Sequence, residues 1–355
     1  MDRRSKLVDG IDLKRSIGAE IGALSHPVVS KSDGTVYYVD YADAAFLREK
    51  YKDDSWVITS NIVEVDAIWG EYSLQEALGP SVKLDYVVAS HVIEHVPDLI
   101  GWLSEVRDVL KQSGQLRLAV PDRRFTFDLL RTETHLSDVL ATYVVGARVP
   151  QPREVIDFAL NAKKVDVVKA WAGTIEREGL ESYYSFEMAM DWAKDAHQNG
   201  GYHDAHCWIF TPRSFAQLFI ELASRHLAIF KCVQFVDTEP NEIEFFVSLA
   251  PCVDVAEAID SWQLMASRAK PHVPSSVEDR LLFLETEHKR LMEQQAERLI
   301  ATGAALDATR HALFQAEEKA QVLEQRVAAM ERSSSWRVTR PLRSVAARIR
   351  SLVAL

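Results

Sequence analysis

Residues 84–98 read LDYVVASHVIEHVPD, and the fold class follows most directly from them. Their first part, Leu84–Ala89, is a short apolar run of the kind that forms a buried strand. Apolar side chains then recur at helical spacing over Leu99–Leu110, and Ser113-Gly114 predicts the end of that helix before a strand at Gln115–Val120. A strand, a helix and a strand in this order predict a parallel pair joined by a crossover.

The same alternation extends to both sides of this unit. Earlier strands are predicted at Gly18–Gly22, Val36–Asp40 and Asn61–Asp66, with a helix over 42–51. A helix opened by Thr211-Pro212 precedes two late strands, Ile229–Val236 and Glu244–Leu249. Because only a short turn separates these two, the last strand should be antiparallel to its neighbour. We therefore predict an α/β fold with a Rossmann-like doubly wound sheet, mostly parallel with an antiparallel last strand.

The remaining sequence divides the chain into regions. The alternation of strands and helices stops at about residue 121. The segments that follow, up to about residue 205, are rich in charged and aromatic residues, which predicts an inserted cap. The expected regions are an α/β domain at 1–255 with its cap at about 121–205, a linker at 256–276, a coiled coil at 277–331, and a basic amphipathic tail at 332–355.

The two C-terminal regions predict assembly and attachment. Leucines at heptad spacing favour a coiled-coil helix that joins copies of the chain into a homo-oligomer, and a lone amphipathic helix lying on the domain is the alternative. Six arginines and no acidic residue follow Glu331. A basic amphipathic helix of this kind binds an anionic membrane surface, and a helix packed on a partner protein is the alternative.

Composition limits the class of protein. The net charge of −11, with the acidic excess placed before the tail, argues against nucleic acid as a partner. The three cysteines form no C-x-x-C pair, which argues against a disulfide framework or a structural zinc site. No apolar run reaches the length that spans a membrane. We expect a cytoplasmic protein, peripheral on the inner face of the membrane.

Three predicted strand ends carry residues suited to a nucleotide. Gly22 ends the first strand, where a glycine lets the backbone approach a ligand closely. Asp40 ends the second strand, where its carboxylate can accept both hydroxyls of an adenosine ribose. Asp66 ends the third, within reach of an adenine amine. A solvated strand end or a helix cap is the alternative for each aspartate taken alone.

Residues 85–98, with Leu110–Leu116 and Val120-Pro121, resemble the fourth-strand and fifth-strand signature of class I methyltransferases. The resemblance covers about 15–130 and implies S-adenosylmethionine as the cofactor. It implies that Glu20 lies near the methionine amino group and that Ser90 and His91 line the sulfonium end. In the family, alternating glycines follow the acidic residue. Here Gly22 matches, but Leu24 and His26 replace the later glycines.

Methylation of a hydroxyl favours a nearby base with a pKa close to neutral, usually histidine. Two clusters offer one: the first is His91 with His95, and the second is His203 with His206. We predict His206 as the main catalytic residue, with His95 and His203 as further candidates. Histidines hydrogen-bonded under the cap are one alternative, and metal ligation by the second cluster with Asp204 is a weaker one. No metal is predicted.

The tail also resembles a known sequence element. Residues 333–343, SSSWRVTRPLR, resemble a short element near the ends of bacterial cell-surface glycosyltransferases and associated methyltransferases. The two resemblances together imply an enzyme that methylates a sugar hydroxyl of a cell-surface glycan or its precursor, with a glycosyltransferase as a candidate partner. A catalytically weak methyltransferase-like scaffold, whose coiled coil recruits polysaccharide enzymes, is the alternative.

Overall fold

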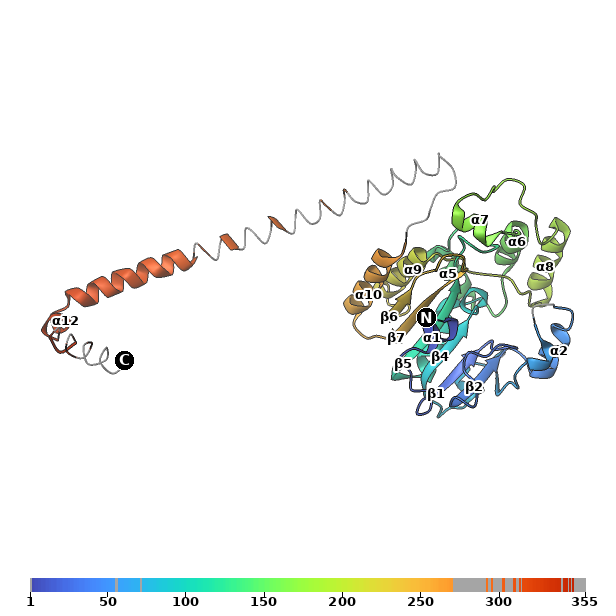
Figure 1. Ribbon diagram of the computed structural model, residues 1–355, viewed down its shortest axis with the longest axis horizontal. Helices are drawn as coiled ribbons and strands as arrows, with labels where there is room; N and C mark the ends of the chain where they lie inside the picture. Colours follow the sequence, from blue (N-terminus) through green and yellow to red (C-terminus); the bar gives the residue numbers. More distant parts are fainter. Residues whose placement is uncertain are drawn as a thin grey trace. The chain divides into compact units, whose positions relative to one another are not determined.

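The computed structural model describes most of the chain up to Lys270 and scattered stretches beyond it (Figure 1). The described residues are 2–54, 57–70, 72–270, 292, 295, 302–303, 309–310, 313, 315–339, 341–343, 345 and 347. The chain forms two compact units, Met1–Ser275 and Ser276–Leu355.

The first unit contains a seven-stranded sheet in the order β3-β2-β1-β4-β5-β7-β6. Its strands are β1 (Ile17–Ile21), β2 (Thr35–Asp40), β3 (Ala67–Ile68), β4 (Leu84–Ser90), β5 (Leu110–Pro121), β6 (Phe230–Val236) and β7 (Glu244–Pro251). Strands β1 to β5 pair in parallel, whereas β7 is antiparallel to both β5 and β6. The predicted Rossmann-like sheet with an antiparallel last strand is therefore confirmed.

Helices lie before, between and after these strands. They are α1 (Arg3–Val8), α2 (Ala44–Lys50), α3 (Leu74–Leu78), α4 (Leu99–Val109), α5 (Leu136–Val145), α6 (Pro152–Asn161), α7 (Val167–Ala172), α8 (Phe186–Asn199), α9 (Pro212–Ser224), α10 (Val255–Arg268) and α12 (Ser334–Val338), with short 3₁₀ turns at Thr59–Asn61 and Ile93–His95.

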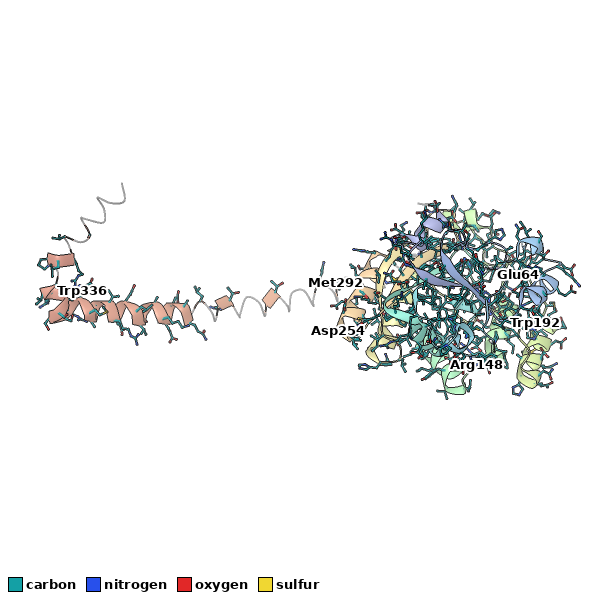
Figure 2. The ribbon with its side chains drawn as sticks, turned by 90° about the horizontal axis from the view of Figure 1, so that it is seen from below. Glu64, Arg148, Trp192, Asp254, Met292 and Trp336 are labelled. Atoms are coloured by element: carbon teal, nitrogen blue, oxygen red, sulfur yellow. The ribbon has the colours of Figure 1, made fainter. Side chains whose placement is uncertain are left out.

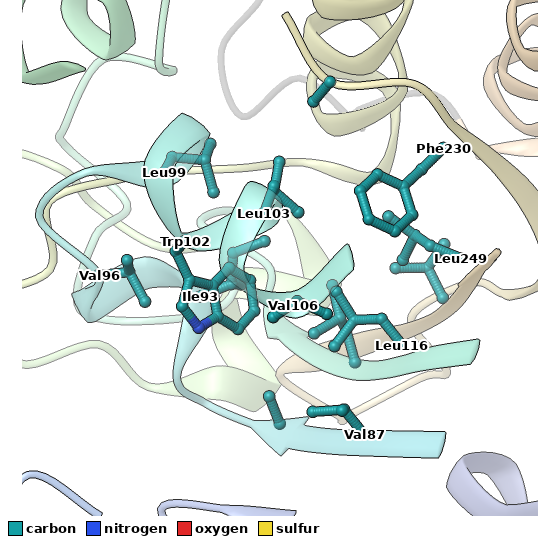
Figure 3. Packing of buried hydrophobic residues seen from close by; sticks show 14 of the residues in the cluster. Val87, Ile93, Val96, Leu99, Trp102, Leu103, Val106, Leu116, Phe230 and Leu249 are labelled. Carbon is teal, nitrogen blue, oxygen red and sulfur yellow. The ribbon is translucent and has the colours of Figure 1, made fainter. Parts of the chain in front are cut away.

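The main core lies on the sheet face that α4, α9 and α10 cover. Helix α4 begins because the Asp98 side chain accepts the Gly101 N–H, and it then presents Trp102, Leu103 and Val106 to the strands (Figure 3). A second core, which contains Leu7 of α1, lies on the opposite face. Both faces are covered, so the open crevice is left at the carboxyl ends of the parallel strands.

The third strand lies directly after the residues that were predicted to form it. The sequence favoured Asn61–Asp66, but the strand is Ala67–Ile68. Asp66 lies just before it, because its backbone N–H donates to the Tyr38 carbonyl and its carboxylate accepts the Tyr38 N–H. Asp66 therefore links the start of β3 to β2 through two hydrogen bonds and does not lie at the end of a strand.

The predicted linker at 256–276 was wrong over the residues of α10. Asp254 starts the helix by accepting the N–H groups of Ala256 and Glu257. Ala258, Trp262 and Met265 lie on one face of it and are buried, and the Trp262 indole donates to the Phe230 carbonyl at 2.7 Å. Helix α10 is thus part of the core. Residues 271–276 lie outside the described residues.

The cap that the sequence predicted at about 121–205 contains α5 to α8. Helices α6 and α8 pack together through Val155, Phe158, Ala193 and Ala196. Most of the predicted coiled coil lies outside the described residues, although 315–332 are helical. Among the residues that the structure describes, none of the helices has the length and apolar character needed to cross a membrane.

Candidate functional site

A cavity of about 460 Å³ opens at the carboxyl ends of β1, β2 and β4. One part of its wall comes from the strand ends and the turns after them, and another from the cap and the segment that returns from it. Its lining includes Ile21, Gly22, Leu24, Asp40, Tyr41, Trp69, His91, His95, Trp102, Glu105, Arg148, Tyr202 and Asp204.

The turn after β1 supplies backbone to the cavity. Gly22 has a φ of +70°, and an added Cβ would lie 3.0 Å from the Val92 side chain, so glycine is needed here. Leu24 also lines the cavity and has a φ of +43°, a conformation that costs energy for a leucine. Although glycine is missing at position 24, the backbone keeps the left-handed conformation that glycine favours.

Glu20 does not line this cavity, so the structure does not place it near a cofactor amino group. Its buried carboxylate accepts the N–H groups of Val28 and Val29 at 2.7 and 2.9 Å. Burial raises the pKa of Glu20 to about 7, despite these two hydrogen bonds. The residue therefore fixes the connection from β1 to β2, which contains no helix.

Three further residues that the sequence predicted for the cofactor, Asp40, Asp66 and Ser90, differ in their positions. Asp40 is only 8% exposed and lines the cavity, and one of its oxygens accepts the Tyr41 N–H at 2.8 Å. Burial raises the pKa of Asp40 to about 6. Asp66 and Ser90 are outside the lining. The Asp66 carboxylate binds Lys31 at 2.6 Å, and the Ser90 hydroxyl accepts from Arg3 at 2.6 Å.

His91, which the resemblance placed at the sulfonium end of the cofactor, follows β4 and lines the cavity. It has a φ of +54°, and its Nε2 lies 2.8 Å from a Glu244 oxygen. Arg3 of α1 donates to the other oxygen of Glu244 at 2.7 Å. The first helix and the last strand therefore hold the turn that carries His91.

The structure brings together His95 and His206, which the sequence had placed in separate clusters. Their rings are 4.6 Å apart between centroids. His95 Nδ1 lies 3.1 Å from Asp204 Oδ1, and His206 Nδ1 lies 2.6 Å from Asp128 Oδ2. Only His95 lines the cavity, and His206 is buried behind it.

Two acidic members of this cluster were missed by the sequence analysis. Glu94 is fully buried, and neither of its carboxylate oxygens has a hydrogen-bond partner. Asp128 is buried too and is paired with Arg131 at 2.8 Å. Glu94 stands beside His95 in the SHVIEH stretch, which could have revealed it, whereas no sequence signal links Asp128 to His206.

The carboxylates around His95 favour positive charge on its ring. Burial alone would lower the pKa of His95, but Asp204, Glu94 and Asp128 together raise it to about 9. Burial also opposes ionisation of Asp128, yet His206 and Arg131 lower its pKa to about 2.

His203 lies apart from this cluster. Its Nε2 is 2.8 Å from Asp195 of α8, its ring stacks on Trp192 at 5.4 Å, and it does not line the cavity (Figure 2 labels Trp192). Its neighbours Tyr202 and Asp204 do face the cavity. Tyr202 stacks on Tyr41 at 5.3 Å and donates to Asp204 at 3.0 Å.

Residues 16–116 match the family described as a methyltransferase domain. No curated protein matches the sequence. Solved structures to which the chain is similar include a putative Zn-dependent alcohol dehydrogenase from Rhodobacter sphaeroides, with 12% identity, 71% of this chain and 91% of that chain covered, and a TM-score of 0.40. Another is the CcbJ methyltransferase from Streptomyces caelestis, with 12% identity, 70% of this chain and 89% of that chain covered, and a TM-score of 0.37. A third is the magnesium protoporphyrin IX methyltransferase from Synechocystis with S-adenosylmethionine bound, with 9% identity, 70% of this chain and 76% of that chain covered, and a TM-score of 0.30.

Proposed function

We propose that this chain, which belongs to the class I methyltransferases and uses S-adenosylmethionine, transfers the methyl group to a hydroxyl of a sugar in a cell-surface glycan or its precursor. The cofactor supplies an electrophilic methyl group on its sulfonium. The oxygen of the acceptor forms the new bond to carbon, the sulfur keeps the electron pair of the broken bond, and the hydroxyl proton leaves.

The residues around the cavity fit the cofactor. Asp40 has one oxygen engaged by Tyr41 N–H, so it retains acceptor capacity for a ribose diol. Gly22 leaves room for a ligand beside the backbone, and Trp69 and Trp102 give the wall apolar surface. We assign ribose recognition to Asp40. We assign no cofactor contact to Glu20, Asp66 or Ser90, whose polar groups are engaged elsewhere.

The observation that carries the proposal of a hydroxyl acceptor is the His95–His206 pair at the cavity wall. An oxygen acceptor must lose a proton, and this pair is oriented by Asp204 and Asp128. We propose that an unprotonated imidazole of this pair accepts that proton. His203 has no part in this step.

Support for a sugar comes from side chains around His95. Tyr202 and Tyr41 line the cavity as a stacked aromatic pair, and Asp204, Glu105 and Arg148 line it with groups that can bind hydroxyls (Figure 2 labels Arg148). Apolar faces next to carboxylates suit a ring that has both C–H faces and hydroxyl edges.

The test is a methyl-transfer assay with labelled S-adenosylmethionine and a panel of sugars, nucleotide sugars and, as a non-sugar comparison, phenols. We expect transfer to a sugar hydroxyl. His95→Ala and His206→Ala should each lower turnover about 100-fold or more and leave cofactor affinity within about threefold. The matched control is His203→Ala, which removes a histidine of the same segment and should keep wild-type turnover. Transfer only to phenols would contradict the sugar assignment, and full activity of both cluster variants would contradict the role of the pair.

A further inference from the structure

The Glu94 carboxylate is buried and accepts no hydrogen bond from the described residues. Its side chain is fully buried, and both oxygens lack a donor. A buried carboxylate without a partner is strongly disfavoured, so such groups are normally protonated, paired or bound to a metal ion. The local fold holds it firmly in place, since the Glu94 carbonyl accepts the N–H groups of Cys207 and Trp208.

Nitrogen atoms surround this carboxylate at distances too long for hydrogen bonds but suited to a shared ion. Nδ1 of His91 lies 3.6 Å from Glu94 Oε1, and Nε2 of His95 and Nε2 of His206 each lie 4.0 Å from it. One ligand atom from each of Glu94, His95 and His206 lies within 4.8 Å of the other two. An ion among them would be roughly 2.5 Å from each atom, so movements of a few tenths of an ångström would give the zinc–ligand distance of about 2.0–2.2 Å.

The far side of each ring is also arranged as in a metal site. Histidine ligands usually give their second nitrogen to a carboxylate, which fixes the ring and its tautomer. Here His206 Nδ1 forms a hydrogen bond with Asp128 at 2.6 Å, and His95 Nδ1 lies 3.1 Å from an Asp204 oxygen without the angle of a hydrogen bond. Asp128 is itself held by Arg131 at 2.8 Å. Both Nε2 atoms are thereby turned toward Glu94.

We propose that Glu94, His95 and His206 bind a divalent transition-metal ion of the zinc type at the wall of the cavity. Two imidazoles and one carboxylate are a ligand set that zinc accepts, and three protein ligands leave a position for an outside oxygen. His95 lines the cavity, so this position adjoins the space for substrate. An ion there would polarise a bound hydroxyl and favour release of its proton to solvent. The site follows from the cluster alone and does not depend on the acceptor being a sugar.

The experiment measures zinc binding to the full chain without cofactor or acceptor, so its outcome is separate from that of the methyl-transfer assay. Protein stripped with a chelator is titrated with Zn²⁺ by calorimetry, and its metal content is then measured by mass spectrometry. We expect one tightly bound ion per chain. A chain that retains no stoichiometric zinc would overturn the proposal.

The zinc affinities of variants of the proposed ligands test where the ion binds. Glu94→Gln keeps the size of the side chain and removes its charge, and His206→Asn removes one ligand nitrogen, so each should weaken zinc binding at least 100-fold. His203→Ala is the control, because it removes the nearby histidine that pairs with Asp195 and should leave affinity unchanged. Equal loss in the control would place the ion at 203–204, and unchanged affinity in Glu94→Gln would also contradict the site.

A measurement on the wild-type chain covers the case in which a variant fails to fold. Co²⁺ replaces Zn²⁺ in sites of this kind and absorbs visible light according to its ligands. Bands typical of nitrogen and oxygen ligands in a four- or five-coordinate site are expected, with a rise in the melting temperature when the ion binds. The spectrum of hydrated Co²⁺ alone, without a shift in melting temperature, would overturn the proposal.

Discussion

Asp40 and Glu20 are buried carboxylates on neighbouring parallel strands, and they have different partners. Glu20 accepts two backbone N–H groups of the loop after β1, whereas the Asp40 carboxylate accepts one N–H and borders the cavity. Burial raises the pKa of both. A carboxylate with one partner at the edge of a cavity is poised to receive donors from a ligand.

The pKa of Asp40, about 6 in the folded chain against an ordinary 3.8, predicts how stability depends on pH. Because the folded state holds this proton more tightly than the unfolded state, the stability associated with it is present below pH 4 and is lost as the pH rises through 6. Asp40→Asn should therefore raise the free energy of unfolding at pH 7.5 by about 1–3 kcal/mol and change it little at pH 4. Urea denaturation at both pH values tests this, and a variant less stable than wild type at pH 7.5 would contradict it.

The sequence alone does not show which carboxylate near a strand end lines the cavity. Asp40, Asp66 and Glu20 all stand at or near predicted strand ends, yet only Asp40 lines the cavity. The direction of a side chain depends on partners that the pattern along one strand does not reveal. In the histidine cluster, Asp128 and His206 are 78 residues apart, so their contact arises only from the tertiary fold.

At the scale of elements, most of the sheet could be predicted because its longer strands contain apolar runs between clear breaks, whereas β3 has only two residues and was misplaced. The antiparallel direction of β7 followed from the short connection between the last two strands. Helix α10 was missed although Ala258, Trp262 and Met265 have helical spacing, because its charged and polar residues resemble those of a linker. Its burial against α9 and β6 becomes visible only in three dimensions (Figure 1).

Helix α10 should be a necessary part of the first unit. The Trp262 side chain is fully buried, so Trp262→Ala should lower the free energy of unfolding by about 3–5 kcal/mol. Leu264, two residues further on and 50% exposed, is the matched control, and Leu264→Ala should change stability by less than about 0.5 kcal/mol. Denaturant unfolding of both variants decides the matter: similar small losses would mean that 256–268 is a linker in solution after all.

At the scale of the whole molecule, the C-terminal unit carries an apolar stripe on its described helix. Leu323, Val327 and Met330 are more than half exposed and follow the spacing of a heptad seam. We propose that residues 277–331 join copies of the chain in a coiled coil. The tail adds six arginines per chain, each worth about 1 kcal/mol near an anionic surface, so an oligomer would bind a membrane through several weak contacts.

Truncation tests both parts of this proposal. Full-length protein and a version ending at 331 should be oligomers by light scattering, and a version ending at 276 should be a monomer. Only full-length protein should sediment with anionic vesicles, less so at high salt, and it should not sediment with neutral ones. Sedimentation of the 331 version, or none of full-length protein at low salt, would instead assign the tail to a protein partner such as a glycosyltransferase.

Calorimetric titration of the full chain with S-adenosylmethionine tests whether the cavity binds the cofactor through Asp40. We predict one bound cofactor per chain, an affinity more than tenfold weaker in Asp40→Ala, and an affinity within about twofold of wild type in Asp66→Ala, whose carboxylate faces Lys31 rather than the cavity. The absence of saturable binding to the folded wild-type chain, or equal affinity in the wild type and Asp40→Ala, would contradict the account.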